Sequence, residues 1–350
     1  MELKNFIFET ISKVGVSGYE HIRGLYLKEK FSEYCDEVTI DTLGNVTALK
    51  RGTNSKKGKL MYMAHMDEIG LMVSHIDEKG IISLTALGGV DQRTLVAQEI
   101  EIFGKEIVKA VVGVKPPHLT SHEDAKKAIK LNELKVDTGL TTEKVKELIS
   151  IGDVAVVSCT PSELLNDRIS SRALDDICCV GVMYEAMKKL QNIKHEVDVY
   201  FVASVQEEIT GNGAKTITQK INPNMGIVID VNFAKTPEIS DIQIELGKGP
   251  VFAIAPTNHR QILKHHKKIA GENGIDFQIV VEKSYMGTDA CDVQVANYGI
   301  ATADIGIPLR YMHTPTEVID MKDIKSTARL ICVFVESFNE IEDMEAFLCY

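Results

Sequence analysis

The sequence predicts an α/β domain with a mixed or largely parallel sheet, interrupted by a β-rich insertion. Four runs of apolar residues have the composition of buried strands, and segments with helical spacing lie between them. Between about residues 68 and 167 the pattern changes to short strands separated by turn signals. We therefore expect one discontinuous domain formed by residues 1–67 and 168–350, with residues 68–167 inserted as a second unit.

The elements of the larger domain follow in order along the chain. An amphipathic helix comes first, with Phe6, Ile7, Ile11 and Val14 at helical spacing and no cleavage signal of a secreted protein. The four predicted strands lie at Lys59–Ala64, Glu196–Val205, Met225–Ile229 and Gly299–Ile305. Apolar residues at helical spacing predict two long helices, over Ile177–Leu190 and Ile324–Phe338.

The insertion begins with a hairpin signal, Asp77–Gly80, between alternating apolar segments. Gly104 separates two further short strands, and Pro116-Pro117 ends the second. A polar helix is expected over Glu123–Leu131, and another helix from Thr141. This mixture predicts a small β-rich unit.

Composition excludes several classes of partner. The 39 basic and 50 acidic residues give a net charge of −11, without a run of Lys and Arg, so nucleic-acid binding is not expected. No apolar run approaches the roughly 20 residues that cross a bilayer, so a membrane partner is not expected either. Seven scattered cysteines without a CxxC pair predict no disulfide framework and a cytoplasmic location.

Acidic and imidazole side chains follow the predicted strands. They are His65 and Asp67 after the first, Glu207 and Glu208 after the second, Asp230 after the third, and His313 a short loop beyond the fourth. Because the carboxyl ends of the strands border the ligand crevice of an open α/β sheet, we expect these side chains on one rim. Asp175-Asp176 adds two carboxylates at the start of a helix, where the helix dipole favours negative charge.

So many converging carboxylates would repel one another unless cations lay between them. Two histidines with several carboxylates are suitable ligands for Zn²⁺, Co²⁺ or Mn²⁺, and no thiolate is positioned to join them. Two metal ions about 3.5–4 Å apart, sharing a carboxylate and a water, form the site of two-metal aminopeptidases. A neighbouring carboxylate that is not a ligand can then carry a proton to the leaving amine. The sequence therefore predicts an enzyme that removes N-terminal residues from peptides.

At this point the chain resembles the tetrahedral-assembly (TET-type) zinc aminopeptidases, a family with glutamyl and deblocking aminopeptidases and relatives labelled endoglucanase. The segments that carry the resemblance, over nearly the whole chain, are Ala64–Asp67, Lys115–Leu119, Arg172–Asp176, Gln206–Glu208, Ile229–Val231, Gly287–Ala290 and Arg310–Pro315. The resemblance implies a zinc-exopeptidase-like α/β/α catalytic domain and an inserted PDZ-like dimerisation domain. It also implies dimers that assemble into a dodecamer.

The resemblance assigns the metal ligands position by position. His65 and Asp230 would hold one ion, and Glu208 and His313 the other. Asp175 would bridge the two ions.

Two further roles follow from the same resemblance. Glu207 would be the general base, and Asp67 would orient His65 through its ring N–H. Asp176 is an alternative to Asp175, since either could merely cap a helix, but the family register favours Asp175.

Side-chain preference stays open at the sequence level. The chain differs from the common family pattern at Ile209, Thr210, Met286 and Cys291, none of which is a proposed ligand. We expect loops such as Tyr285–Asp292 and Asn258–Gln261 to form the substrate pocket. Arg260 could suit an acidic side chain, although a surface arginine is the commoner outcome.

A pair of histidines, His265-His266, lies among lysines on a helix, so we expect it to be solvated. It is not expected to take part in the site.

Two other functions fit the sequence less well. A glycoside hydrolase needs two carboxylates that face a sugar, which would leave His65 and His313 without a role. The chain also has only 6% aromatic residues and no Trp. A non-catalytic scaffold of the same fold would not need the free carboxylate of Glu207.

Overall fold

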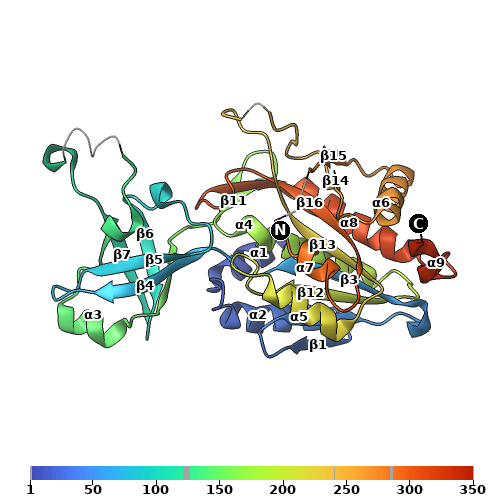
Figure 1. The fold of residues 1–350 in the computed structure, drawn as a ribbon, viewed down its shortest axis with the longest axis horizontal. Helices are drawn as coiled ribbons and strands as arrows, with labels where there is room; N and C mark the ends of the chain where they lie inside the picture. The colour runs from blue at the N-terminus through green and yellow to red at the C-terminus, as the bar shows by residue number, and fades with distance from the viewer. Residues whose placement is uncertain (1, 121–126, 240, 284–286, 350) are drawn as a thin grey trace.

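The structure, a computed structural model, describes residues 2–120, 127–239, 241–283 and 287–349 (Figure 1). Its central element is an eight-stranded mixed sheet in the order β1-β2-β12-β3-β13-β16-β14-β15. The strands are β1 Glu37–Ile40, β2 Val46–Lys50, β3 Lys59–His65, β12 Asp198–Ser204, β13 Met225–Phe233, β14 Val251–Ile254, β15 Gln278–Val281 and β16 Ala301–Leu309.

The four strands expected from apolar runs are β3, β12, β13 and β16, and they are neighbours at the centre of the sheet. They pair in parallel, β12 with β3, β3 with β13 and β13 with β16, so their carboxyl ends share one edge. One detail differs from the expectation. Strand β13 continues to Phe233, so Asp230 lies inside the strand and not beyond it.

Helices cover both faces of the sheet, which confirms the predicted α/β fold. On one face α1 (Glu2–Ser12), α2 (His21–Ser32), α4 (Leu174–Leu190), α6 (Arg260–Glu272) and α8 (Met321–Ser337) share the largest apolar core. On the other face α5 (Asn212–Ile221) and α7 (Ala290–Gln294) pack on a smaller cluster. Both long helices expected from apolar spacing, α4 and α8, are present and pack against each other. The short helix α9 (Met344–Leu348) follows α8.

The inserted strands close into a small barrel in the order β4-β5-β8-β7-β6-β9, which stands beside the α/β domain in Figure 1. They are β4 Gly70–Ile76, β5 Ile82–Leu87, β6 Glu99–Phe103, β7 Ile107–Gly113, β8 Lys135–Asp137 and β9 Val154–Val157. The barrel has an apolar core of its own, and the expected hairpin joins β4 to β5. Helix α3 (Thr142–Leu148) begins as expected after Thr141, whose side chain accepts a hydrogen bond from the backbone N–H of Lys144.

A second, smaller sheet contains strands that adjoin two segments of the site. Strands β10 (Ser162–Leu164), β11 (Arg168–Ser171) and β17 (Glu317–Asp320) form it in that order. Strand β17 follows His313, and β11 leads into α4. The small sheet therefore supports the segments that carry Asp175 and His313.

Two expectations about helices need correction. Residues 121–126 of the helix expected over Glu123–Leu131 lie outside the described residues, and its described remainder forms no α-helix before the short 3-10 turn Leu131–Glu133. His266 is buried on α6, where it stacks on Phe252 and Phe334, so the expected solvated pair is wrong for this residue. Burial lowers the pKa of His266 to about 3, and the imidazole is neutral at ordinary pH.

Among the described residues, no helix is both long and apolar enough to cross a membrane. All seven cysteines lie in described residues, and no disulfide joins any of them.

Candidate active site

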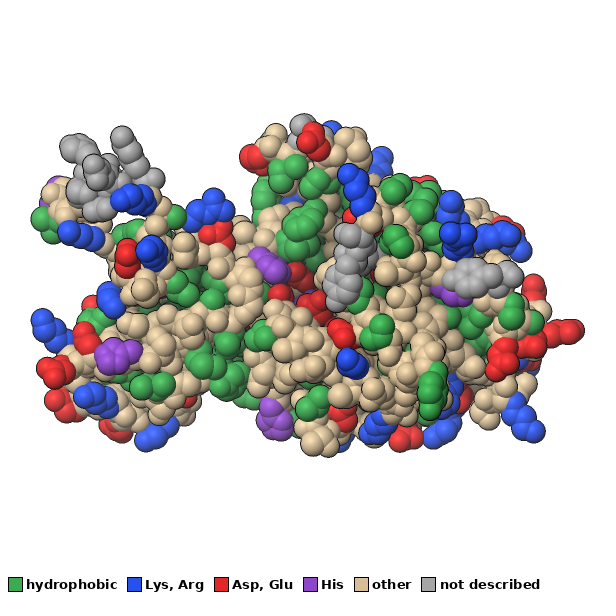
Figure 2. Space-filling view, in the orientation of Figure 1, with side chains coloured by type: hydrophobic (Ala, Val, Ile, Leu, Met, Phe, Trp, Pro, Cys, Tyr) green, Lys and Arg blue, Asp and Glu red, His purple; other side chains and the backbone are tan. Residues whose placement is uncertain are grey.

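The histidine and acidic residues expected in the site lie together at one edge of the central sheet, in a hollow where Figure 2 shows acidic side chains beside a histidine. His65 is the last residue of β3, and Glu207 and Glu208 follow β12. Asp230 lies in β13, and His313 lies between β16 and β17. The parallel register of the four central strands places these residues side by side.

Two groups of potential ligand atoms form there, and they share one residue. His65, Asp175 and Asp230 form one group, and Asp175, Glu208 and His313 form the other. Asp175 Oδ1 lies 3.2 Å from His65 Nε2, and Asp175 Oδ2 lies 3.2 Å from His313 Nε2. Glu208 Oε2 lies 3.3 Å from the same His313 atom. One carboxylate thus faces two separate sets of ligands.

These separations suit metal coordination. Two ligand atoms that each lie about 2.0–2.1 Å from a tetrahedral zinc ion are about 3.3 Å apart. Nitrogen and oxygen donors without a thiolate match Zn²⁺, Co²⁺ or Mn²⁺. The residues present therefore fit one divalent ion in each group.

The charges of the site also favour bound divalent cations. Burial raises the pKa of Glu207 to about 9, and nearby Asp230 and Asp289 add to this effect while His65 opposes it. Burial also raises the pKa of Asp230 well above its usual value. Hydrogen bonds to Asp175 and Glu208 raise the pKa of His313 to about 11. The carboxylates outnumber the imidazoles, and divalent cations would restore their ionised forms.

Glu207 belongs to neither group of ligand atoms. Its Oε2 atom lies 3.8 Å from His65 Nε2, and its side chain lines the same cleft. The two adjacent glutamates therefore differ in position, with Glu208 beside His313 and Glu207 on the side of His65.

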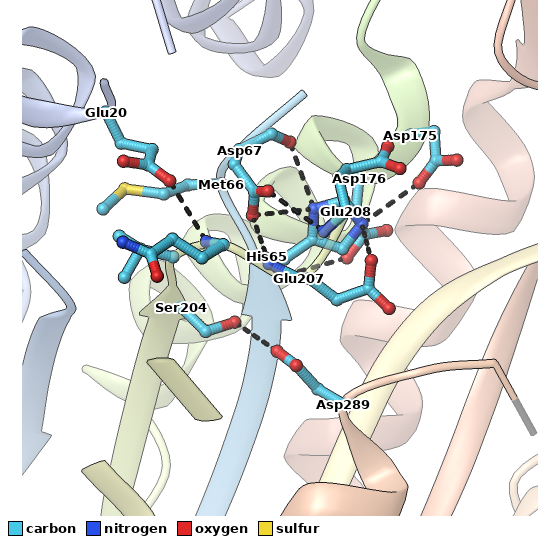
Figure 3. A network of polar contacts seen from close by, with 12 residues as sticks. Glu20, His65, Met66, Asp67, Asp175, Asp176, Ser204, Glu207, Glu208 and Asp289 are labelled. Atoms are coloured by element: carbon cyan, nitrogen blue, oxygen red, sulfur yellow. Dashed lines mark hydrogen bonds and ion pairs between the residues drawn. The ribbon is translucent and has the colours of Figure 1, made fainter. Parts of the chain in front are cut away.

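Asp67 is completely buried and contacts both His65 and the backbone of Glu207 and Glu208 (Figure 3). The contact expected between Asp67 and the ring of His65 is present. His65 Nδ1 lies 3.1 Å from the backbone oxygen of Asp67 and 3.5 Å from its Oδ1 atom, so the backbone oxygen is the closer partner. The Asp67 carboxylate accepts the backbone N–H groups of Glu207 and Glu208, at 3.0 Å and 3.1 Å. Asp67 thus fixes the backbone of both glutamates.

Two buried glutamates of the site were not anticipated from the sequence. Glu317 accepts the backbone N–H of Asp175 at 3.1 Å and that of His313 at 2.8 Å. Glu20 accepts the backbone N–H of Gln206 at 3.1 Å. Both act on backbone groups, so no spacing of side chains in the sequence could have indicated them.

Asp176, the alternative to Asp175, lies behind the site. It is fully buried and its Oδ2 atom accepts the backbone N–H of His65 at 3.2 Å. It could form a further ligand group with Cys178 and Cys179. Burial raises the pKa of both thiols, which disfavours the thiolate that binds metal.

A cleft of about 690 Å³ opens over the ligand groups, a volume suited to a small ligand. Ile209, Thr210 and the segment from Gly287 to Asp289 line it, together with Asp292. Met286 lies outside the described residues. The other loop expected here, Asn258–Gln261 with Arg260, does not line the cleft. Cys291 is buried in α7 and does not line it either.

Comparison with known proteins bears directly on this geometry. The family model described as M42 glutamyl aminopeptidase matches residues 44–330. The chain belongs to this family. A lysyl aminopeptidase from Pyrococcus furiosus is 38% identical over 339 residues, which cover 95% of this chain and 96% of that protein.

Solved peptidase structures match both the fold and the length. An aminopeptidase from the archaeon Desulfurococcus kamchatkensis has a TM-score of 0.89 and 34% identity, with 97% of this chain and 98% of that one covered. A TET1 peptidase from Pyrococcus horikoshii has a TM-score of 0.84 and 29% identity, covering 95% and 99%. That peptidase is described as able to assemble into a tetrahedron or a large octahedral shell.

Membership of the M42 family confirms the resemblance found in the sequence. The chain is a metallo-aminopeptidase, a hydrolase that acts on peptides with divalent metal ions. The family match favours this function over both the glycoside hydrolase and the scaffold.

Proposed function

We propose that this M42 chain is a two-metal aminopeptidase in which Asp175 would be a ligand of both ions. His65 and Asp230 would complete the ligands of one ion, and Glu208 and His313 those of the other. The observation that carries the proposal is the pair of ligand groups that share Asp175, with one of its oxygens facing each histidine. Zinc or cobalt, and also manganese, suits these ligands.

Glu207 is the proposed general base. Its carboxylate lines the cleft, borders His65 and belongs to neither ligand group, so it stays available for a proton. When bound, the two ions supply Lewis acidity that activates water and polarises the scissile carbonyl. Glu207 then accepts a proton from the attacking water at its carboxylate and delivers it to the leaving amine. Asp67 holds the backbone of Glu207 and Glu208 throughout.

The charge of the cleft supports a preference for basic N-terminal residues. Besides the proposed ligands and base, the described lining includes Glu282, Asp289 and Asp292, and it includes neither Lys nor Arg. Asp289 is buried and its Oδ1 atom has no hydrogen-bond partner among the described residues. An ammonium or guanidinium group would be attracted to these carboxylates, and an acidic side chain repelled. The relative named lysyl aminopeptidase supports the same preference.

The proposal extends to assembly. We infer that the chain forms a homo-oligomer, with residues 68–167 as the dimerisation domain and dimers joined into a dodecamer. The TET1 relative that can assemble into a tetrahedron or a large octahedral shell supports this, as do the apolar side chains of Ile107 and Val111 exposed on barrel strand β7. Light scattering should give about twelve times the 38.7 kDa of one chain. The absence of disulfides supports the expected cytoplasmic location.

Hydrolysis of a panel of aminoacyl-p-nitroanilides by metal-free protein, before and after addition of Zn²⁺ or Co²⁺, tests the function. Cleavage that appears only with metal and disappears in Glu207→Gln supports the proposal. Cleavage by metal-free protein would contradict it.

A further inference from the structure

The backbone of the glutamate loop, residues Gln206–Glu208, is held by an unbroken row of hydrogen bonds (Figure 3). Each of its three consecutive N–H groups points at a buried carboxylate oxygen. Gln206 donates to Glu20 Oε1 at 3.1 Å, Glu207 to Asp67 Oδ1 at 3.0 Å and Glu208 to Asp67 Oδ2 at 3.1 Å. Two carboxylates from the first 70 residues thus fix the loop that carries the base.

Glu20 is well placed for this task. It is 5% exposed and directly precedes α2, whose first turn it joins through the bond from Gly24 N–H to its backbone oxygen. The same Oε1 atom also accepts the backbone N–H of Gly18 at 2.8 Å. One oxygen therefore ties the loop before α2 to the loop after β12.

The segment around Glu20 is in turn attached to the segment that carries Asp67. Backbone hydrogen bonds join Ser17 N–H to Glu68 O at 3.1 Å and Glu68 N–H to Gly15 O at 3.0 Å. The buried Arg23 donates to the backbone oxygen of Met66 at 2.7 Å. The two carboxylates that hold the glutamate loop are therefore fixed relative to each other.

The loop needs such support because Gln206 has a φ angle of 63°. A non-glycine residue in this left-handed region is strained and persists only where its surroundings hold it. Without the acceptor at Gln206 N–H, the loop would lose its first attachment, one residue before the base.

We infer that Glu20 is a positioning residue for the general base, acting through the backbone of Gln206. The inference rests on the proposed role of Glu207. Glu20 itself does not line the cleft and is outside both ligand groups, so its effect passes entirely through the loop. The loop requires an acceptor oxygen at the position of Glu20 Oε1, and it does not require the negative charge of the carboxylate.

This distinction sets the choice of variants. Glu20→Gln keeps a carbonyl oxygen at the position of Oε1, which can still accept both backbone N–H groups. Glu20→Asp keeps the charge but withdraws it by one methylene, and Glu20→Ala removes the acceptor. Acceptor and charge are thereby separated without a change in any residue of the cleft.

The test measures kcat, KM, metal content and hydrogen–deuterium exchange in metal-loaded protein. For Glu20→Ala and Glu20→Asp we expect kcat to fall roughly 10- to 100-fold, because small misplacements of catalytic groups have effects of this size. We expect KM and metal content to stay near the wild-type values, and exchange of the peptide that spans residues 204–211 to be faster. Glu20→Gln should keep kcat within about threefold of wild type, with slow exchange, since its acceptor remains.

Each alternative outcome is informative. Unchanged kcat and exchange in Glu20→Asp would overturn the inference, and so would a Glu20→Gln variant as impaired as Glu20→Ala. If Glu20→Ala does not fold, the comparison between the Gln and Asp variants still decides. Glu207→Gln, assayed alongside, separates the two claims: its retention of activity would refute the proposed base, while the exchange data would still test Glu20.

Discussion

The Oδ2 atom of Asp175 lies 3.2 Å from Nε2 of His313, while the other oxygen of the same carboxylate lies 3.2 Å from Nε2 of His65. The two histidines come from β3 and from the loop after β16, on either side of β13 in the sheet. A carboxylate in this position can serve two ions at once. Glu317 accepts the backbone N–H groups of both Asp175 and His313, and so fixes these two residues relative to each other.

Replacement of Asp175 by Asn should therefore disturb both ion sites together. Asparagine has one acceptor oxygen in place of two, so we expect no more than one tightly bound ion per chain. Activity should fall by at least about 100-fold, since loss of a metal ligand removes the catalytic ion. Metal analysis after dialysis measures the effect, with the exposed Asp276→Asn as the matched control. Two tightly bound ions in Asp175→Asn would show that Asp175 is not a bridge.

The acidic cleft predicts a selectivity that can be measured with isosteric substrates. Lysine and norleucine have side chains of similar length but differ in charge, so the ratio of their kcat/KM values isolates the electrostatic part. We expect the lysyl substrate to be preferred and Asp292→Asn to lower the ratio roughly 5- to 10-fold. Asp276→Asn should leave the ratio unchanged. A preference for norleucine or glutamate in the wild-type enzyme would contradict the assigned substrate class.

The buried cluster of Glu68 with Arg23 and Arg172 should dominate local stability. Glu68 bonds to both arginines, and Arg23 is fully buried. Glu68→Gln would leave two guanidinium groups without their counter-ion, which should cost about 3–5 kcal/mol of the free energy of unfolding. The exposed pair of Glu37 and Arg51 provides the control, since Glu37→Gln should cost no more than about 1 kcal/mol. Urea-induced unfolding distinguishes the two, and equal effects would refute the argument.

Acid sensitivity should depend in part on His266, which is not among the proposed metal ligands. Burial lowers its pKa from 6.5 to about 3, so below pH 6.5 the unfolded chain binds a proton that the folded protein does not. The free energy of unfolding therefore falls as the pH falls from 6.5 towards 3, by at most about 1.4 kcal/mol per unit. Between pH 7 and pH 5, His266→Phe should lose about 2 kcal/mol less than wild type. Parallel losses in the two proteins would show that His266 does not titrate as expected.

The sequence predicted the parts of the fold that depend on local apolar patterns. The strands β3, β12, β13 and β16 are buried over nearly all of their length, so each appears in the sequence as a mostly apolar run of strand length. The residues at their carboxyl ends then follow from the general rule for ligand crevices in α/β sheets. That rule predicted that these side chains would gather at one edge of the sheet, and the family resemblance then named the proposed metal ligands and Glu207 among them.

The remainder depended on contacts that the sequence does not display. Glu20 bonds to Gln206 across 186 positions, and its partner is a backbone N–H that every residue type offers. His266 was expected to be solvated because of the lysines around it. Its helical spacing from Ile262 and Ile269, which are both buried on the same helix, is the pattern in the sequence that indicates its core position. Asn258–Gln261 could not be excluded from the cleft without the path of the chain between β14 and α6.

The adjacent glutamates provide the most direct test of the central claim, that Glu207 handles the proton while Glu208 holds an ion. Bound metal per chain and kcat should be measured together in Glu207→Gln and Glu208→Gln. We expect both variants to lose activity, by about 10²- to 10⁴-fold for the base. Glu207→Gln should bind two ions as wild type does, and Glu208→Gln should bind fewer. If Glu207→Gln instead loses an ion while Glu208→Gln keeps both, the roles assigned to the two residues are wrong.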